Sequence, residues 1–236
     1  MKRLLLLSNS TTPKTGFLGH AIGTISDFLG SDVTEVLFIP YATVIESYDN
    51  YASRIREVFR AKDYRLTSIH ECHDSIEAVN KAQAIVIGGG NTFRLLRCLY
   101  DERLLKAIRN RVNLGMPYIG SSAGANVACP TIKTTNDMPI VWPPSAEALD
   151  LIPFQINPHY IDTDQTGFHG ETRAQRITEF THLNPDIHVV GLPEGGMIRI
   201  EGSMIQLLGC EMAMVFLAGA EPAAYRSLQF LEKLLR

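Results

Sequence analysis

A serine between two glycines, Ser122 in Gly120-Ser121-Ser122-Ala123-Gly124, is the residue of this chain that most directly suggests chemistry. The stretch has the form G-x-S-x-G, follows a short apolar run and precedes a segment typical of a helix start. This pattern forms a sharp strand-to-helix turn that exposes a serine hydroxyl at the top of an α/β sheet. Such a turn needs strained backbone angles and close backbone approach, so a Cβ at either glycine would clash. We therefore predict that Ser122 is a nucleophile.

A serine hydroxyl is a weak nucleophile and needs a base within hydrogen-bonding distance. Of the seven histidines, His159 stands apart because it ends the extended run Phe154–His159, which contains a proline and places an imidazole at a strand end. His169 is the second candidate, in a segment flanked by glycine. We predict that His159 is the base.

Two carboxylates compete to orient that base. Glu194 directly follows the expected strand Val189–Leu192, at the carboxyl edge of a sheet, whereas Asp137 lies in a loop rich in Thr and Asn with no rigid element expected beneath it. An orienting acid must be held firmly, which favours Glu194. Asp137 has two other interpretations, an Asx-turn and a site for a substrate amine.

Acyl transfer also needs hydrogen-bond donors for the developing oxyanion. One is the backbone N–H of Ala123, and the turn Gly88-Gly89-Gly90-Asn91 after the expected strand Ala84–Ile87 offers more, at Gly89 and Gly90. Asn91 is a candidate substrate-binding residue. The same turn fits a phosphate cradle, but it lacks the G-x-G-x-x-G pattern and the P-loop lysine, which disfavours nucleotide binding. A non-enzymatic protein that binds a phosphate or nucleotide remains the alternative to an enzyme.

The elements that position these residues alternate between apolar runs and segments of helical period. The expected strands are Leu4–Leu7, Val36–Ile39, Leu66–Ile69, Ala84–Ile87, Tyr118–Gly120 and Val189–Leu192, and the expected helices are Phe17–Leu29, Tyr48–Lys62, Ser75–Lys81, Thr92–Leu99, Leu104–Asn113 and Thr172–His182. Short apolar strands that bracket helices predict an α/β fold with a doubly wound, mostly parallel sheet and helices on both faces. Ligands in such folds bind beyond the carboxyl ends of the strands.

Other segments depart from this alternation. Residues 130–168 predict irregular loops over the active site, Met197–Ile200 and Met204–Leu208 predict an antiparallel hairpin, and Phe216-Leu217 predicts an edge strand. Residues 227–236 have helical spacing and predict a C-terminal helix. The whole chain, 1–236, is expected to form a single domain.

Composition excludes several classes of partner. The chain has 236 residues, is 45% hydrophobic and carries a formal net charge of −3, so it offers no basic surface for nucleic acid or an anionic membrane. The N-terminal apolar run is too short for a signal peptide, and the four scattered cysteines suit reduced thiols, so we expect a cytoplasmic protein. The ligand types in His70-Glu71-Cys72-His73 fit no standard zinc spacing. A homo-oligomer is compatible with the sequence.

These motifs together resemble the serine peptidase family of the cytoplasmic α-aspartyl dipeptidases, the peptidase E family. The resemblance spans most of the chain and rests on the blocks Leu7–Thr11, Gly88–Phe93, Ile119–Asn126, Cys129–Ile132, Thr134–Ile140, Gln155–His159, Gly170–Arg173 and Leu192–Gly195. It implies a fold akin to class I glutamine amidotransferases, hydrolysis of dipeptides with an N-terminal aspartate, and no metal or cofactor.

The resemblance also implies roles for individual residues. The family's nucleophile falls on Ser122 and its base on His159, and the acids described for the family fall on Asp137 and Glu194. The substrate's side-chain carboxylate needs a cation, for which Arg173 is the candidate because a guanidinium can bind a carboxylate in bidentate fashion. His169 is a second candidate for this role. A cyanophycinase-like isopeptidase on the same fold is the enzymatic alternative.

Overall fold

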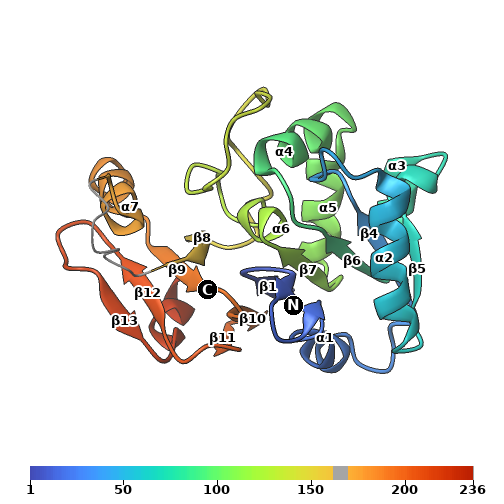
Figure 1. Ribbon diagram of the computed structural model, residues 1–236, viewed down its shortest axis with the longest axis horizontal. Helices are drawn as coiled ribbons and strands as arrows, with labels where there is room; N and C mark the ends of the chain where they lie inside the picture. Colours follow the sequence, from blue (N-terminus) through green and yellow to red (C-terminus); the bar gives the residue numbers. More distant parts are fainter. Residues whose placement is uncertain (162–169, 236) are drawn as a thin grey trace.

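A seven-stranded mixed sheet forms the centre of the computed structural model, which describes residues 1–161 and 170–235. Its strand order is β11-β10-β1-β7-β6-β4-β5 (Figure 1). Five strands run parallel: β1 (Arg3–Leu7), β4 (Glu35–Ile39), β5 (Arg65–Ser68), β6 (Ala84–Ile87) and β7 (Tyr118–Ser121). The hairpin of β10 (Met197–Glu201) and β11 (Met204–Leu208) adds two antiparallel strands beside β1, as the alternating pattern predicted.

Helices cover both faces of this sheet. On one face α1 (Ile22–Leu29) and α2 (Tyr48–Arg60) pack against the side chains of Leu5 and Leu7, and on the other α3 (Ser75–Lys81), α4 (Thr92–Asp101) and α5 (Leu104–Asn113) pack against Leu4 and Leu6. Successive residues of a strand point to opposite faces, so one continuous apolar run serves both cores. The prediction of a doubly wound α/β fold is confirmed.

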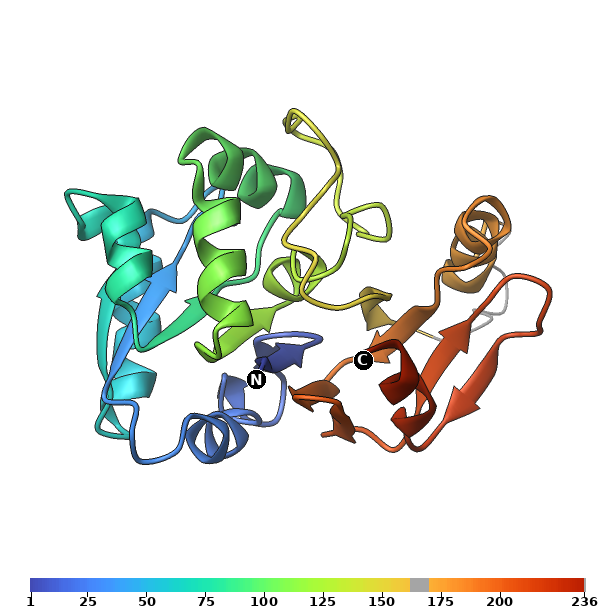
Figure 2. The same cartoon turned by 180° about the vertical axis from the view of Figure 1, so that it is seen from behind.

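A second, four-stranded sheet lies beside the central one, at the end of the molecule opposite α2 and α3 (Figures 1 and 2). Its order is β13-β12-β9-β8, from β8 (Gln155–Tyr160), β9 (Val189–Pro193), β12 (Ala213–Phe216) and β13 (Ala223–Tyr225). Helix α7 (Arg173–Leu183) packs on it through a buried isoleucine. This sheet corrects two expectations: Val189–Leu192 belongs to it and not to the central sheet, and the strand at Phe216 is an inner strand and not an edge.

Several short elements also differ from expectation. Helix α1 begins at Ile22 and not at Phe17, because Gly16 takes a left-handed φ of 71° and β3 (Gly16–Phe17) instead pairs with β2 (Thr11–Thr12). The expected strand at 66–69 ends one residue earlier, where the 3-10 helix η1 (Ile69–Glu71) begins. The expected C-terminal α-helix is the 3-10 helix η2 (Gln229–Leu234), with Leu228 and Leu231 buried. Residues three apart lie on the same side of a 3-10 helix, so this conformation buries Leu228 and Leu231 together.

The long connection between α6 (Ala123–Asn126) and β8 is irregular, as predicted. Within it the described residues form one isolated antiparallel bridge, between Thr131 and Glu147. None of the helices in the described part of the chain is long and apolar enough to cross a membrane.

Candidate active site

The turn between β7 and α6 has the geometry that its glycines predicted. Ser122 takes a φ of 51°, a left-handed conformation that is unusual for a residue with a side chain. A Cβ at Gly120 would lie 2.3 Å from the carbonyl oxygen of Gly124, and a Cβ at Gly124 would lie 2.3 Å from that of Ile87. The two glycines therefore let α6 approach the sheet closely, and this approach holds Ser122 at the carboxyl edge of β7.

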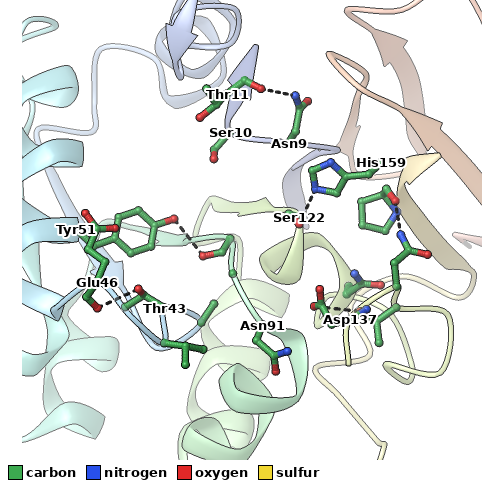
Figure 3. Close-up of a pocket in the computed structure, with 18 of the residues that line it drawn as sticks. Asn9, Ser10, Thr11, Thr43, Glu46, Tyr51, Asn91, Ser122, Asp137 and His159 are labelled. Atoms are coloured by element: carbon green, nitrogen blue, oxygen red, sulfur yellow. Dashed lines mark hydrogen bonds between the residues drawn. The ribbon is translucent and has the colours of Figure 1, made fainter. Parts of the chain in front are cut away.

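Three side chains form a hydrogen-bonded chain at this edge. Ser122 Oγ lies 3.0 Å from His159 Nε2, and His159 Nδ1 lies 3.0 Å from Glu194 Oε1. Figure 3 shows the serine and the imidazole facing each other at the side of a cavity. The imidazole and the carboxylate are 39% and 55% exposed, so solvent reaches the outer part of the chain. A nucleophile, a base and an orienting carboxylate at these distances suit acyl transfer.

A β-bulge presents the imidazole. The register of β8 against β9 shifts between Asn157 and Tyr160, and His159 takes a φ of 53°. A bulge of this kind redirects a side chain out of its strand. It brings His159, on the second sheet, within hydrogen-bonding distance of Ser122 at the end of β7 in the central sheet.

The carboxyl end of β1 is bonded to all three segments of this chain. The carbonyl of Leu7 accepts from the N–H of Ser122 (2.9 Å), Ser8 Oγ accepts from the N–H of His159 (2.8 Å), and Asn9 Oδ1 accepts from the N–H that follows Glu194 (2.7 Å). Ser8 Oγ also donates to the carbonyl of residue 192 in β9. Reasoning from the sequence missed Ser8 and Asn9 as individual residues, although both lie in a block that carries the family resemblance.

The predicted oxyanion donors meet at the same place. Gly89 approaches the serine so closely that a Cβ on it would lie 3.2 Å from Ser122 Cβ, and both Gly89 and Gly90 line the cavity. Among the described residues, the N–H groups of Gly89, Gly90 and Ala123 have no hydrogen-bond acceptor. Tyr51 fixes the turn by donating to the carbonyl of Gly89 (3.3 Å), and burial raises the pKa of its hydroxyl to about 12, which keeps it a donor.

Asp137 is held firmly, which corrects the expectation of a loop with no rigid element beneath it. Its Oδ2 accepts from the N–H (2.7 Å) and the hydroxyl (2.6 Å) of Thr92, at the N-terminus of α4, and lies 3.2 Å from Thr135 Oγ1. A helix N-terminus stabilises a negative charge. Asp137 lines the cavity, but the carboxylate bonded to His159 is that of Glu194. Asn91 also lines the cavity while it caps α4 by accepting from the N–H of Arg94.

The cavity has a volume of about 600 Å³ and lies beyond the carboxyl ends of the parallel strands. In Figure 3, Ser122 and His159 lie opposite Thr43, Glu46 and Tyr51. It is the size of a small-molecule site.

Arg173 lies next to the base but outside the described lining of the cavity. Its Nη1 donates to the carbonyl of His159 (3.3 Å) and to Asn157 Oδ1 (3.4 Å), and burial lowers the pKa of the guanidinium. His169, the second candidate for the substrate's carboxylate, lies outside the described residues.

One cluster of potential metal ligands lies elsewhere in the described residues, at Asp49, His70 and Glu71. The carboxylate of Glu71 accepts two hydrogen bonds from Arg56, and His70 Nε2 bonds to Asp49. These groups thus satisfy one another and do not line the cavity.

Comparisons with known proteins identify the family and support the fold. The family model for peptidase family S51 matches residues 4–208. Peptidase E of Nostoc sp. is 51% identical over 224 residues, covering 95% of this chain and 93% of that protein, and peptidase E of Salmonella typhimurium is 46% identical over 221 residues, covering 94% and 96%. The crystal structure of a peptidase from an acI-B1 Actinobacterium aligns with a TM-score of 0.66 at 16% identity, covering 95% of this chain and 97% of that one, which shows a shared fold.

Proposed function

The chain belongs to peptidase family S51, and on that premise we propose that it is a dipeptidase that releases aspartate from the N-terminus of Asp-Xaa dipeptides. The observation that carries this proposal is the hydrogen-bonded chain from Ser122 through His159 to Glu194 at the wall of a cavity of about 600 Å³. The peptidase E proteins at 46% and 51% identity support the dipeptidase assignment.

The proposed reaction begins when Ser122 Oγ attacks the carbonyl carbon of the aspartyl residue while His159 Nε2 takes the hydroxyl proton. Glu194 keeps Nδ1 of the imidazole protonated and stabilises the imidazolium that forms. The N–H groups of Gly89, Gly90 and Ala123 hold the oxyanion of the tetrahedral intermediate.

The intermediate collapses when its C–N bond breaks and His159 gives the proton to the leaving amine. A water then attacks the acyl-enzyme and passes a proton to the same imidazole. The second tetrahedral intermediate releases free aspartate as the C–O bond to Ser122 breaks and the hydroxyl regains its proton.

The ends of the substrate need two further contacts. We assign the substrate's ammonium group to Asp137, because this carboxylate lines the cavity and is held in place by Thr92 at the N-terminus of α4. Arg173 remains the predicted cation for the aspartyl side chain, supported by its contact with the His159 carbonyl. Changing Arg173 to Gln should then raise KM for aspartyl-leucine at least tenfold, with Arg176→Gln on the exposed side of α7 as the control. An unchanged KM would remove Arg173 from substrate binding.

The decisive experiment is cleavage of aspartyl-leucine by wild type and Ser122→Ala, with alanyl-leucine, glutamyl-leucine and β-aspartyl-leucine alongside. Selective α-aspartyl cleavage that Ser122→Ala abolishes is the expected result. Cleavage that survives the substitution would remove Ser122 from the mechanism, and selective cleavage of a β-aspartyl-arginine isopeptide would favour the cyanophycinase-like alternative. A cytoplasmic location is also part of the proposal, supported by four free cysteines.

A further inference from the structure

Asn126 carries a buried side-chain amide that no described residue satisfies. The residue is 2% exposed, its Oδ1 is buried without a hydrogen-bond partner, and its Nδ2 donates to none of the described residues. Burying a polar group without a partner is unfavourable, and most buried polar groups in folded proteins are paired. A group left unpaired in this way has its full hydrogen-bonding capacity free for a ligand.

The amide belongs to the wall of the catalytic cavity. Asn126 is the last residue of α6, four positions after Ser122, and residues four apart lie on one side of a helical turn. It lines the same cavity as Ser122, Asp137 and His159. The buried hydroxyl of Ser121 is also unpaired, but Ser121 is not among the residues that line the cavity. Among the described lining residues, Asn126 is therefore the one with a buried side-chain atom that lacks a hydrogen-bond partner.

Other polar side chains that line the cavity are already engaged. The side chain of Asn136 donates to the carbonyl of Pro158 (2.7 Å) and accepts from Asn157 (2.7 Å). Thr135 Oγ1 bonds within the cluster of Thr92 and Asp137. A negatively charged ligand group that enters the cavity therefore finds the NH₂ group of Asn126 uncommitted, whereas the guanidinium of Arg54, also in the described lining, is paired with Glu46.

We propose that Asn126 determines specificity by donating a hydrogen bond from its amide to the side-chain carboxylate of the substrate's aspartyl residue. This inference rests on the proposed function. Asp137 attracts the substrate's ammonium group and repels its side-chain carboxylate. The ammonium group therefore binds at Asp137, and the carboxylate binds at the amide of Asn126. The contact adds a donor to the charge that Arg173 is predicted to supply.

The test measures kcat/KM for aspartyl-leucine and for asparaginyl-leucine, its neutral isostere, in wild type, Asn126→Asp and Asn126→Ala. A carboxylate at 126 repels the aspartyl side chain and accepts from the asparaginyl amide. Since a hydrogen bond to a charged group is lost, the preference for aspartyl-leucine should fall about 10- to 150-fold in Asn126→Asp. It should fall by a smaller factor in Asn126→Ala, which removes the amide without adding a charge.

Asn110→Asp makes the same chemical change at an exposed position of α5, and its preference should equal that of wild type. Where a variant folds but turns over too slowly, the affinities for L-aspartate and for L-asparagine, measured by isothermal titration calorimetry, give the same ratio from binding alone. Folded variants that keep the wild-type ratio within twofold would overturn the inference and leave the proposed function standing. A wild type without α-aspartyl preference would overturn both.

Discussion

Removing the charge of Glu194 while keeping its shape tests the assignment of the orienting acid. In Glu194→Gln the side-chain oxygen can still accept from His159 Nδ1, across the 3.0 Å that now separates the two groups. What disappears is the attraction between a carboxylate and the imidazolium that forms when Ser122 gives up its proton. The substitution therefore lowers catalysis mainly by destabilising the charged transition state.

The exposure of the pair determines how large this effect is. Two unit charges about 4 Å apart interact by about 1 kcal/mol in water and about 4 kcal/mol in surroundings typical of a protein surface. The imidazole is 39% exposed and the carboxylate 55% exposed, so solvent screens the pair substantially. We expect a loss of about 2 kcal/mol, which is roughly 30-fold in kcat/KM. A buried triad aspartate changed to asparagine costs far more, about 10⁴-fold in kcat.

The assay is steady-state cleavage of aspartyl-leucine by wild type and Glu194→Gln, with thermal unfolding to confirm that both are folded. Glu179→Gln, at an exposed position on α7, removes one negative charge away from the site and should leave kcat/KM unchanged. A Glu194→Gln enzyme within twofold of wild type would refute the role of Glu194. A loss approaching 10⁴-fold would refute the argument from solvent screening.

Three further predictions concern the scaffold of the site. Ser8→Ala leaves the partly buried N–H of His159 without its acceptor, so it should cost about 1–3 kcal/mol of unfolding free energy, measured by denaturant titration. It should also lower kcat about tenfold or more with little change in KM. Gly124→Ala places a Cβ 2.3 Å from a backbone oxygen and should lower the free energy of unfolding by about 2 kcal/mol or more. Gly23→Ala, with open space around it in α1, should instead raise the free energy of unfolding by about 0.5 kcal/mol. Equal melting temperatures for the two variants would contradict this prediction. Burial raises the pKa of the Cys129 thiol to about 12, so iodoacetamide at pH 8 should spare it in the folded protein and label it after unfolding.

The central sheet and its helices could be predicted from the sequence because each carries a clear period. Continuous apolar runs such as Leu4–Leu7 mark strands buried on both faces, and α3 and α5 have the bounds that their spacing predicted. The strand-to-helix turn at Ser122 was equally clear, because the glycines at 120 and 124 are required by local backbone contacts.

The second sheet was harder to predict because its strands are short and come from distant segments. β8 pairs in parallel with β9 across the whole of α7, and no local pattern distinguishes that partner from a strand of the central sheet. The same limit applies to Ser8, whose hydroxyl bonds to a backbone group 151 residues away. Asn126 has no sequence signal of its own, because burial without a partner is visible only once the fold is known.

The position of β1 has a consequence for the synthesis of the chain. β1 precedes every other element, yet it pairs with β7 at Leu4–Tyr118 and with β10 at Arg3–Glu201. Contacts between residues so far apart in sequence form late and slowly. During synthesis on the ribosome, β1 can therefore complete its pairing only after almost the whole chain, including β10, has emerged. A nascent or truncated chain that ends before β10 still has β7 beside β1 but lacks the second neighbour of β1. We therefore expect peptidase activity only when folding is nearly complete.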